Sequence, residues 1–102
     1  MSNITQARKA LTKRILEGAG ESLPVDRRAA FNNSSLAEPV GALVDKVAKH
    51  PHKITDEDIN AAKVSGFNED QIFEIVVCAA IGQASRQYDA ALAALEAVTG
   101  ND

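Results

Sequence analysis

Apolar residues recur every three or four positions along most of the chain, the spacing that gathers them on one face of an α-helix. In residues 5–16 lysines and arginines surround this apolar face, and in residues 39–49 the stripe follows Pro39, a residue suited to a first helical turn. Between these segments, residues 21–35 contain Pro24 and a polar Asn-Asn-Ser-Ser run, which predict a connector with one or two helical turns. The pattern therefore predicts a helical first half that is interrupted by a connector.

Capping residues specify two further helix starts. Thr55 precedes three acidic residues, and its hydroxyl can accept a hydrogen bond from the first helical turn. Asn68 is followed three positions later by Gln71, the spacing of a capping box. Gly66 lies between the two starts and suits a left-handed helix end. We therefore expect one helix between Thr55 and Gly66 and another that begins just after Asn68.

The last helix is predicted to run from about Glu69 to Val98, which is long for so small a chain. Nine of the ten residues in 72–81 are apolar, so every face of the helix must be covered there. Two seven-residue repeats of apolar or small residues then favour close packing against another helix. The other predicted helices carry too little apolar surface to cover this helix, so we expect a homo-oligomer that associates through it. The repeats consist of Val77, Ala84, Ala91 and Val98, and of Ile81, Tyr88 and Leu95.

Composition supports a helical protein. The chain has 102 residues, of which 45% are apolar and 25% charged, proportions typical of one globular domain. Its 18 alanines and four aromatic residues favour helices over strands. We expect a single all-α domain over residues 1–102, in which residues 1–35 form an N-terminal helix and connector and residues 36–102 form the helical core.

Charge and cysteine content narrow the class of partner. A net charge of −3 argues against a general nucleic-acid binder, although residues 1–53 hold nine Lys or Arg against five acids. The one cysteine, Cys78, cannot form an internal disulfide and fits a reducing compartment. The sequence shows no signal peptide and no apolar run long enough for a bilayer. It therefore predicts a cytoplasmic protein without membrane or nucleic-acid partners.

Cys78 and Glu74 lie one helical turn apart in the most apolar part of the predicted last helix. A thiol beside a carboxylate could act as a nucleophile with a proton acceptor, which makes both residues candidates for catalysis. A buried cysteine is more often an inert apolar residue, and an ionised carboxylate would raise the pKa of the thiol rather than lower it. The inert interpretation is therefore favoured for Cys78.

His52 and Arg86 are the other candidates for chemistry. His52 and His50 flank a proline, but two histidines are too few ligands for a zinc site, so no metal or cofactor is expected. His52 remains a candidate for a general acid or base. Arg86 and Gln83 belong to the polar band of the last helix, where Arg86 can pair with Asp89 or bind a carboxylate or hydroperoxide ligand. We treat Arg86 and Gln83 as candidate ligand-binding residues.

One known pattern resembles the second half of this chain. Three motifs follow one another: the acidic helix start Thr55–Asp58, the segment Gly66–Ile72 that opens a long apolar helix, and the polar pair Ser85–Arg86. In this order they resemble the second part of the carboxymuconolactone decarboxylase-like, or AhpD-like (alkylhydroperoxidase-like), superfamily. The resemblance spans about residues 42–92, half of the chain, and implies an all-α AhpD-like fold whose subunits associate through their long helices.

The resemblance lacks the redox motif of the superfamily. Redox members carry a glutamate and a C-x-x-C-x-x-x-H motif on a helix upstream of the matched region. Residues 16–36, the corresponding stretch here, contain neither cysteine nor histidine, and Cys78 cannot be equated with either family cysteine. The resemblance therefore implies the fold more directly than it implies an activity.

Two classes of function follow from these observations. The first is a homo-oligomeric, ligand-binding or accessory protein without dithiol redox chemistry. The second is an enzyme of the same superfamily, which either reduces hydroperoxides through Cys78 or acts on a small organic acid, as a decarboxylase or isomerase, through His52, Glu74 or Arg86. The enzyme hypothesis requires a polar pocket near Arg86 and solvent access to Cys78 or His52.

Overall fold

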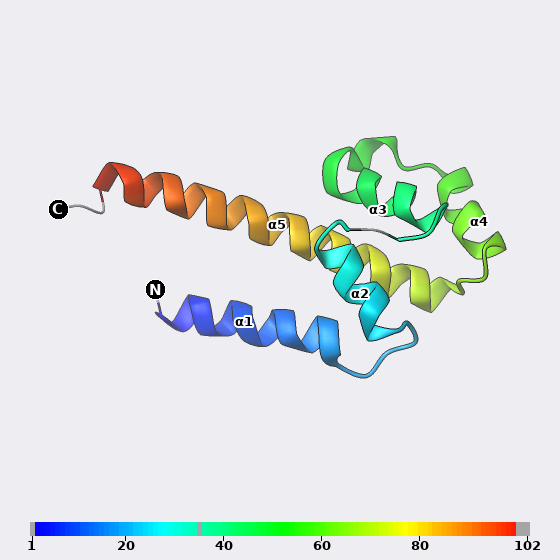
Figure 1. The fold of residues 1–102 in the computed structure, drawn as a ribbon, viewed down its shortest axis with the longest axis horizontal. Coiled ribbons are helices and arrows are strands. Elements are labelled where there is room, and N and C mark those ends of the chain that lie inside the picture. Colours follow the sequence, from blue (N-terminus) through cyan, green and yellow to red (C-terminus); the bar gives the residue numbers. More distant parts are fainter. Residues whose placement is uncertain (1, 35, 100–102) are drawn as a thin grey trace.

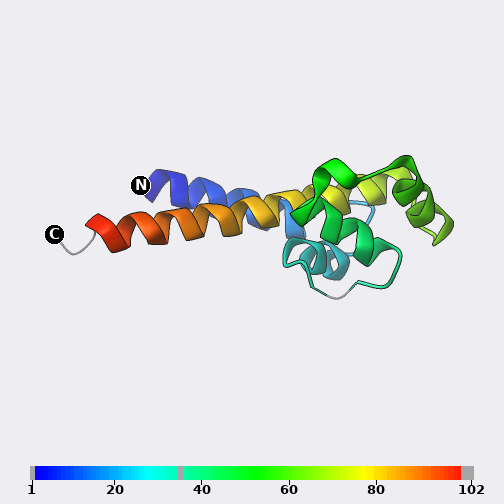
Figure 2. The ribbon, with the colours of Figure 1, turned by 90° about the horizontal axis from the view of Figure 1, so that it is seen from above.

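The structure, a computed structural model, describes residues 2–34 and 36–99, and all regular structure in these residues is helical (Figures 1 and 2). The expected all-α class and the long C-terminal helix are thereby confirmed for this part of the chain. No helix in the described ranges combines the length and apolar character that crossing a membrane demands. In chain order the elements are α1 (Ser2–Glu17), α2 (Pro24–Phe31), α3 (Val40–Lys49), the 3₁₀ turn η1 (Pro51–Lys53), α4 (Asp56–Val64) and α5 (Glu69–Thr99).

Both predicted helix caps are present, and each forms a reciprocal capping box. The Thr55 hydroxyl accepts a hydrogen bond from the Asp58 N–H at 3.4 Å, and the Asp58 carboxylate accepts one from the Thr55 N–H at 2.9 Å. Asn68 and Gln71 make the same reciprocal pair at 2.8 Å in each direction. Between the two boxes, Gly66 adopts a φ of +116°, which residues with a side chain rarely adopt. Local chemistry thus determines where α4 and α5 begin.

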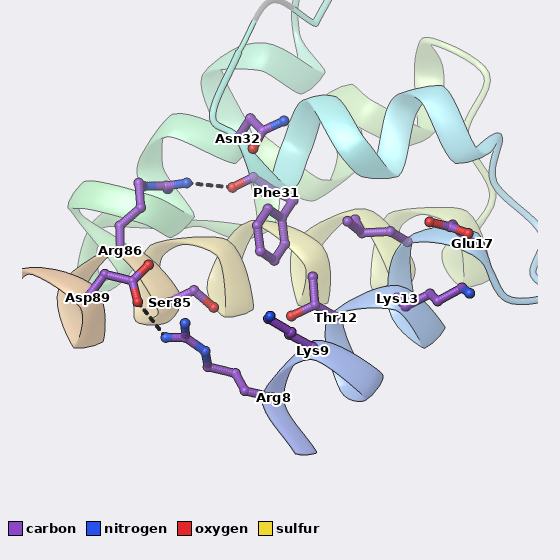
Figure 3. Close-up of a pocket in the computed structure, with 11 residues that line it drawn as sticks. Arg8, Lys9, Thr12, Lys13, Glu17, Phe31, Asn32, Ser85, Arg86 and Asp89 are labelled. Atoms are coloured by element: carbon purple, nitrogen blue, oxygen red, sulfur yellow. Dashed lines mark hydrogen bonds and ion pairs between the residues drawn. The ribbon is translucent and has the colours of Figure 1, made fainter. Parts of the chain in front are cut away.

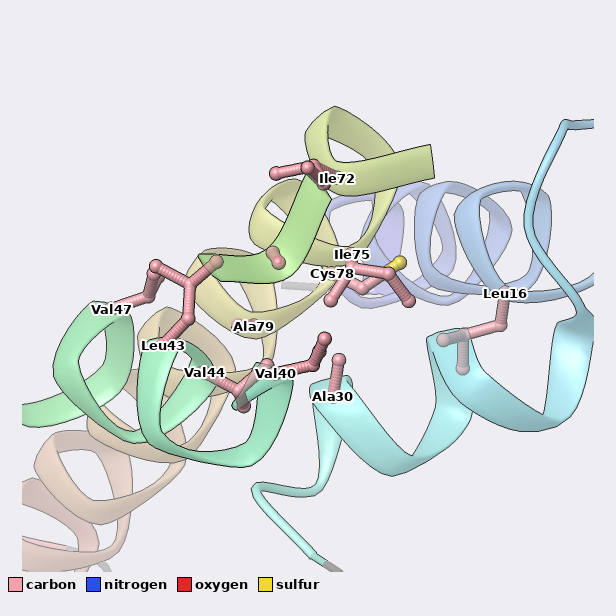
Figure 4. Close-up of a cluster of buried hydrophobic side chains, with 11 residues drawn as sticks. Leu16, Ala30, Val40, Leu43, Val44, Val47, Ile72, Ile75, Cys78 and Ala79 are labelled. Atoms are coloured by element: carbon pink, nitrogen blue, oxygen red, sulfur yellow. The ribbon is translucent and has the colours of Figure 1, made fainter. Parts of the chain in front are cut away.

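Helix α5 is the central helix, and the other α-helices pack against it. Helices α2 and α3 pack on its N-terminal half, and α4 lies against its first turns (Figures 1 and 2). Helix α1 runs alongside the second half of α5 in the opposite direction. Figure 4 shows the core, in which the apolar stripe of α3 faces α5 and α2 closes one side. The buried apolar cluster consists of Leu16, Ala30, Val40, Leu43, Val44, Val47, Ala62, Ile72, Ile75, Cys78 and Ala79.

The segment expected to be a connector contains helix α2, which packs against α5 more extensively than any other helix does. Ala30 is fully buried there. Gly82 of α5 allows this approach, because a Cβ at that position would overlap the Phe31 carbonyl and lie 2.8 Å from the Phe31 Cα. A glycine inside a helix normally costs about 1 kcal/mol relative to alanine. Here its lack of a side chain is what brings α2 into contact with α5.

We expect Gly82→Ala to lower the free energy of unfolding by about 2 kcal/mol, because the new methyl group pushes α2 away from α5. Helix propensity alone predicts the opposite sign, a gain of about 1 kcal/mol. Urea unfolding followed by circular dichroism measures the difference. Ala90→Gly, at an exposed site of the same helix, reports the Ala/Gly difference without a clash. A stabilised Gly82→Ala variant would contradict the close approach.

Candidate functional site

An open groove of about 500 Å³ lies between α1 and α5, and the end of α2 borders it (Figure 3). Arg86, Asp89 and Arg8 lie at one end of this groove, which we call the α1–α5 groove, and Lys13 and Glu17 lie at the other. Between them the surface is mixed, with hydroxyl groups beside apolar side chains. The remaining lining residues are Lys9, Thr12, Leu16, Phe31, Asn32 and Ser85.

Arg86 is held at the border of this groove by two neutral acceptors. Its Nη1 donates to the Phe31 carbonyl oxygen at 2.6 Å, and its Nη2 donates to Gln83 Oε1 at 3.0 Å. The structure therefore brings together the two residues expected to bind a ligand. Neither acceptor carries a formal charge, so these bonds orient the guanidinium without neutralising it.

The expected pairing of Arg86 with Asp89 is wrong. Asp89 instead accepts a hydrogen bond from Arg8 of α1 at 2.7 Å. The Arg8 guanidinium also lies over the Tyr88 ring, 4.7 Å from its centroid, in a cation–π contact. The spacing of three residues allowed the Arg86–Asp89 pair, but the packing of α1 on α5 supplied a competing cation.

The α1–α5 groove carries an excess of positive charge. Four cationic side chains border it, from Arg8, Lys9, Lys13 and Arg86, against two carboxylates. Asp89 is paired with Arg8, and Glu17 lies 3.5 Å from Arg28 of α2. Within residues 2–34 and 36–99, neither Lys9 nor Lys13 forms an ion pair. A groove with this balance attracts anions.

Glu74 and Cys78 line a separate crevice of about 200 Å³ near the end of α1. The Cys78 side chain is 1% exposed, and its Sγ donates to the Ile15 carbonyl oxygen at 3.7 Å. Burial raises the pKa of the thiol; the guanidinium of Arg27 opposes this shift and the carboxylate of Glu74 adds to it. The thiolate needed for nucleophilic chemistry is therefore disfavoured.

Glu74 has a structural task in this crevice. Its carboxylate accepts hydrogen bonds from the Glu21 N–H at 2.8 Å, the Ser22 N–H at 2.8 Å and the Ser22 hydroxyl at 2.5 Å. Partial burial acts to raise the pKa of Glu74, but these hydrogen bonds and nearby Arg27 outweigh it and lower the pKa. The Glu74 carboxylate thus anchors the turn between α1 and α2 to helix α5.

The sequence did not reveal the part played by Arg27, which is 4% exposed. Its Nη1 donates to the carbonyl oxygens of Ile15 and Gly18, at 3.1 and 2.8 Å, and so satisfies acceptors at the C-terminal end of α1. The sequence also did not assign Lys9 or Lys13 to a site. The only signal was their membership of the basic cluster in residues 5–16, and nothing local shows that this cluster faces α5.

His52 lies apart from both hollows. It is exposed on η1, where its ring meets the His50 ring edge to face with centroids 6.2 Å apart. It lines neither the α1–α5 groove nor the crevice of Glu74. No group of three or more His, Cys, Asp or Glu side chains that could hold a metal ion occurs in the part of the chain that the structure describes.

Comparisons of the chain with protein-family models, with curated proteins and with solved structures find no match. The AhpD-like resemblance therefore stays a prediction, and the function must be argued from the groove and crevice themselves.

We expect Glu74→Gln to lower the free energy of unfolding by about 1–2 kcal/mol at pH 7, because hydrogen bonds to a charged acceptor are the stronger ones. The fold lowers the pKa of Glu74, so the contribution is complete above the ordinary glutamate pKa of 4.5 and is lost as the pH falls through the folded-state pKa. Urea unfolding at about pH 7 and about pH 3 should show the difference shrinking at the lower pH. Glu96→Gln, an exposed site on the same helix, should show no such trend. A difference for Glu74→Gln that is independent of pH would contradict this role.

We expect Cys78 in the folded protein to react with dithiobis(nitrobenzoate) about 100-fold more slowly than an exposed thiol, because the reagent needs a thiolate that it can reach. Stopped-flow absorbance of the released thiolate measures the rate. Ala93→Cys supplies the exposed thiol on the same helix. Equal rates for the two thiols in the native protein would show that Cys78 is accessible after all.

Proposed function

We propose that this protein is a member of the AhpD-like superfamily without dithiol redox chemistry that binds a small organic anion in the α1–α5 groove. The main support for this proposal is the set of hydrogen bonds that Arg86 makes. Its guanidinium borders the groove and donates to two neutral oxygens rather than to a carboxylate. Lys9 and Lys13 add positive charge to the same groove. An anion would supply the charge that the described residues leave uncompensated.

The rest of the groove favours an organic anion over a bare inorganic one. The Phe31 ring and Leu16 offer apolar surface, and the hydroxyls of Thr12 and Ser85 offer neutral hydrogen-bonding groups. Small-molecule sites combine these features, a mostly apolar lining with a few polar groups that fix orientation. A volume of about 500 Å³ also lies in the range of such sites. A small carboxylic acid with a planar or cyclic body fits this description.

The enzyme hypothesis has unequal support in its two forms. Hydroperoxide reduction through Cys78 needs a reachable thiolate, whereas the thiol is 1% exposed and burial raises its pKa. Action on a small organic acid needs a binding site near Arg86, which the groove supplies. His52 and Glu74 lie outside this groove, so an acid–base partner for such a reaction is not among the candidates named from the sequence.

We expect the protein to bind benzoate measurably more tightly than the neutral isostere benzamide, and we expect Arg86→Gln to weaken benzoate binding about 10-fold or more, as loss of a charged hydrogen-bond partner does. Isothermal titration calorimetry measures both affinities. Increasing salt should weaken benzoate binding but not benzamide binding.

Arg86 also donates a hydrogen bond to the end of α2, so Arg86→Gln can weaken binding by disturbing the fold. Two further variants control for this effect. Lys9→Gln and Lys13→Gln alter the groove at residues that make no ion pair in the described ranges, and each should weaken benzoate binding by a smaller factor. Lys49→Gln on α3 removes a cation that pairs with Asp45 outside the groove and should leave binding unchanged. Equal binding of benzoate and benzamide, or an effect of Lys49→Gln as large as that of Arg86→Gln, would refute the proposed site.

A further inference from the structure

The outward face of α5 is apolar along its whole length and has no cover within the described residues. Phe73, Leu95 and Val98 are 69%, 59% and 83% exposed, and what makes them informative is that they lie on one face of the same helix. At about 100° per residue, six exposed residues fall within about 60° of one another on the helix. We call them the α5 outer stripe: Phe73, Ala80, Ala84, Ala91, Leu95 and Val98.

The surface area and shape show that this chain leaves more surface uncovered than a closed monomer does. Its accessible surface is 6760 Å², whereas a compact monomer of 10.8 kDa exposes about 5,500 Å². Its radius of gyration is 15.5 Å, against about 13 Å for a compact domain of this length. The excess, about 1,200 Å², exceeds the roughly 800 Å² that each partner buries in a standard stable interface.

We infer that the α5 outer stripe is covered by the α5 outer stripe of a second copy of this chain, and that the two helices run antiparallel. The stripe is self-complementary in this direction. One register places Phe73 opposite the partner's Val98 and, at the same time, Ala80 opposite the partner's Ala91. Large side chains then meet at both ends, alanines meet on either side of the centre, and Ala84 faces the partner's Gln87 at the centre. The alanine pairs allow the helix axes to approach closely.

Charge decides between the antiparallel and the parallel arrangement. Helix α5 begins with Glu69 and Asp70, and Arg86 is its one cation. A parallel pair would bring the four carboxylates of the two helix starts together and align the two helix dipoles. An antiparallel pair in this register separates these starts by about 48 Å, several Debye lengths at physiological salt, and opposes the dipoles.

A hollow beside the stripe fits the same register. Ile59 of α4 and Ile72, Phe73 and Val76 of α5 line a mostly apolar depression of about 290 Å³ next to Phe73. In the antiparallel register the end of the partner's α5 reaches this depression. The partner's Leu95 and Val98 are the apolar side chains available to fill it.

The pairing leaves the anion groove open. Ser85, Arg86 and Asp89, the α5 residues that line the α1–α5 groove, lie about 100–160° around the helix from the stripe. This inference therefore does not depend on anion binding, and either can fail alone. Benzoate titration reports on the groove, and the mass and cross-linking of the chain report on the stripe.

Disulfide cross-linking tests the register and the direction together. We expect the double variant Ala80→Cys/Ala91→Cys to form an intermolecular disulfide on mild oxidation, because the facing positions come within bonding distance. The two positions lie about 16 Å apart within one chain and cannot bridge there. Ala80→Cys alone and Ala91→Cys alone should not cross-link, because each then faces an alanine. In a parallel pair each single variant would cross-link with itself, and that result would overturn the inference.

Light scattering tests whether the stripe is covered at all. We expect a dimer or a multiple of it, and we expect Leu95→Glu to reduce the apparent dimerisation constant by at least about 10-fold. Ala93→Glu places the same charge at an exposed site on the other side of α5 and should leave the mass unchanged. A monomeric wild-type chain, or equal effects of the two glutamates, would overturn the inference even if benzoate still binds.

Discussion

The apolar segment 72–81 of α5 imposes the constraint on which the rest of the structure depends. Nine of its ten residues are apolar and lie on every side of the helix, so burying them favours a cover of other helices around the segment. Helices α2, α3 and α4 gather around this segment for that reason. Ala79 and Ile75 are almost fully buried as a result, and Gly82 marks the point where α2 comes closest. The α5 segment beyond Gly82 lacks this cover, apart from the side against α1.

Polar contacts, more than apolar packing, position helix α1. Arg27 satisfies carbonyl groups at the end of α1, Glu74 holds the following turn, and the Arg8–Asp89 pair joins α1 to the middle of α5. Exposed ion pairs such as the last contribute little stability, whereas the partly buried contacts of Arg27 and Glu74 contribute more. Because α1 forms one wall of the α1–α5 groove, the geometry of the groove depends on these contacts. Glu74, a catalytic candidate in the sequence, thus supports the groove from a distance.

Helix α5 presents different sides to three environments. One side packs in the core, a second borders the α1–α5 groove through Ser85, Arg86 and Asp89, and a third carries the α5 outer stripe. A 31-residue helix is long enough for different segments of the chain to pack along different parts of its length. This arrangement explains why so small a protein contains so long a helix. It also means that a substitution in the α1–α5 groove leaves the α5 outer stripe intact, and the reverse.

The local features of this protein could be predicted from its residues alone: the helical class, the start of α4 at Thr55, the start of α5 at Asn68 and the glycine turn between them. Capping and periodicity act over a few residues, so they can be read without knowing the fold. The tertiary structure alone decided the partners of Arg86, the burial of Arg27 and the placing of Lys9 beside α5. These depend on segments more than fifty residues apart, as the Arg86–Phe31 bond shows, or on how two helices dock. Cys78 and Glu74 illustrate this difference. Their spacing of one turn on the same helix could be predicted from the sequence. The burial of Cys78 and the contact of Glu74 with the α1–α2 turn became known only from the fold.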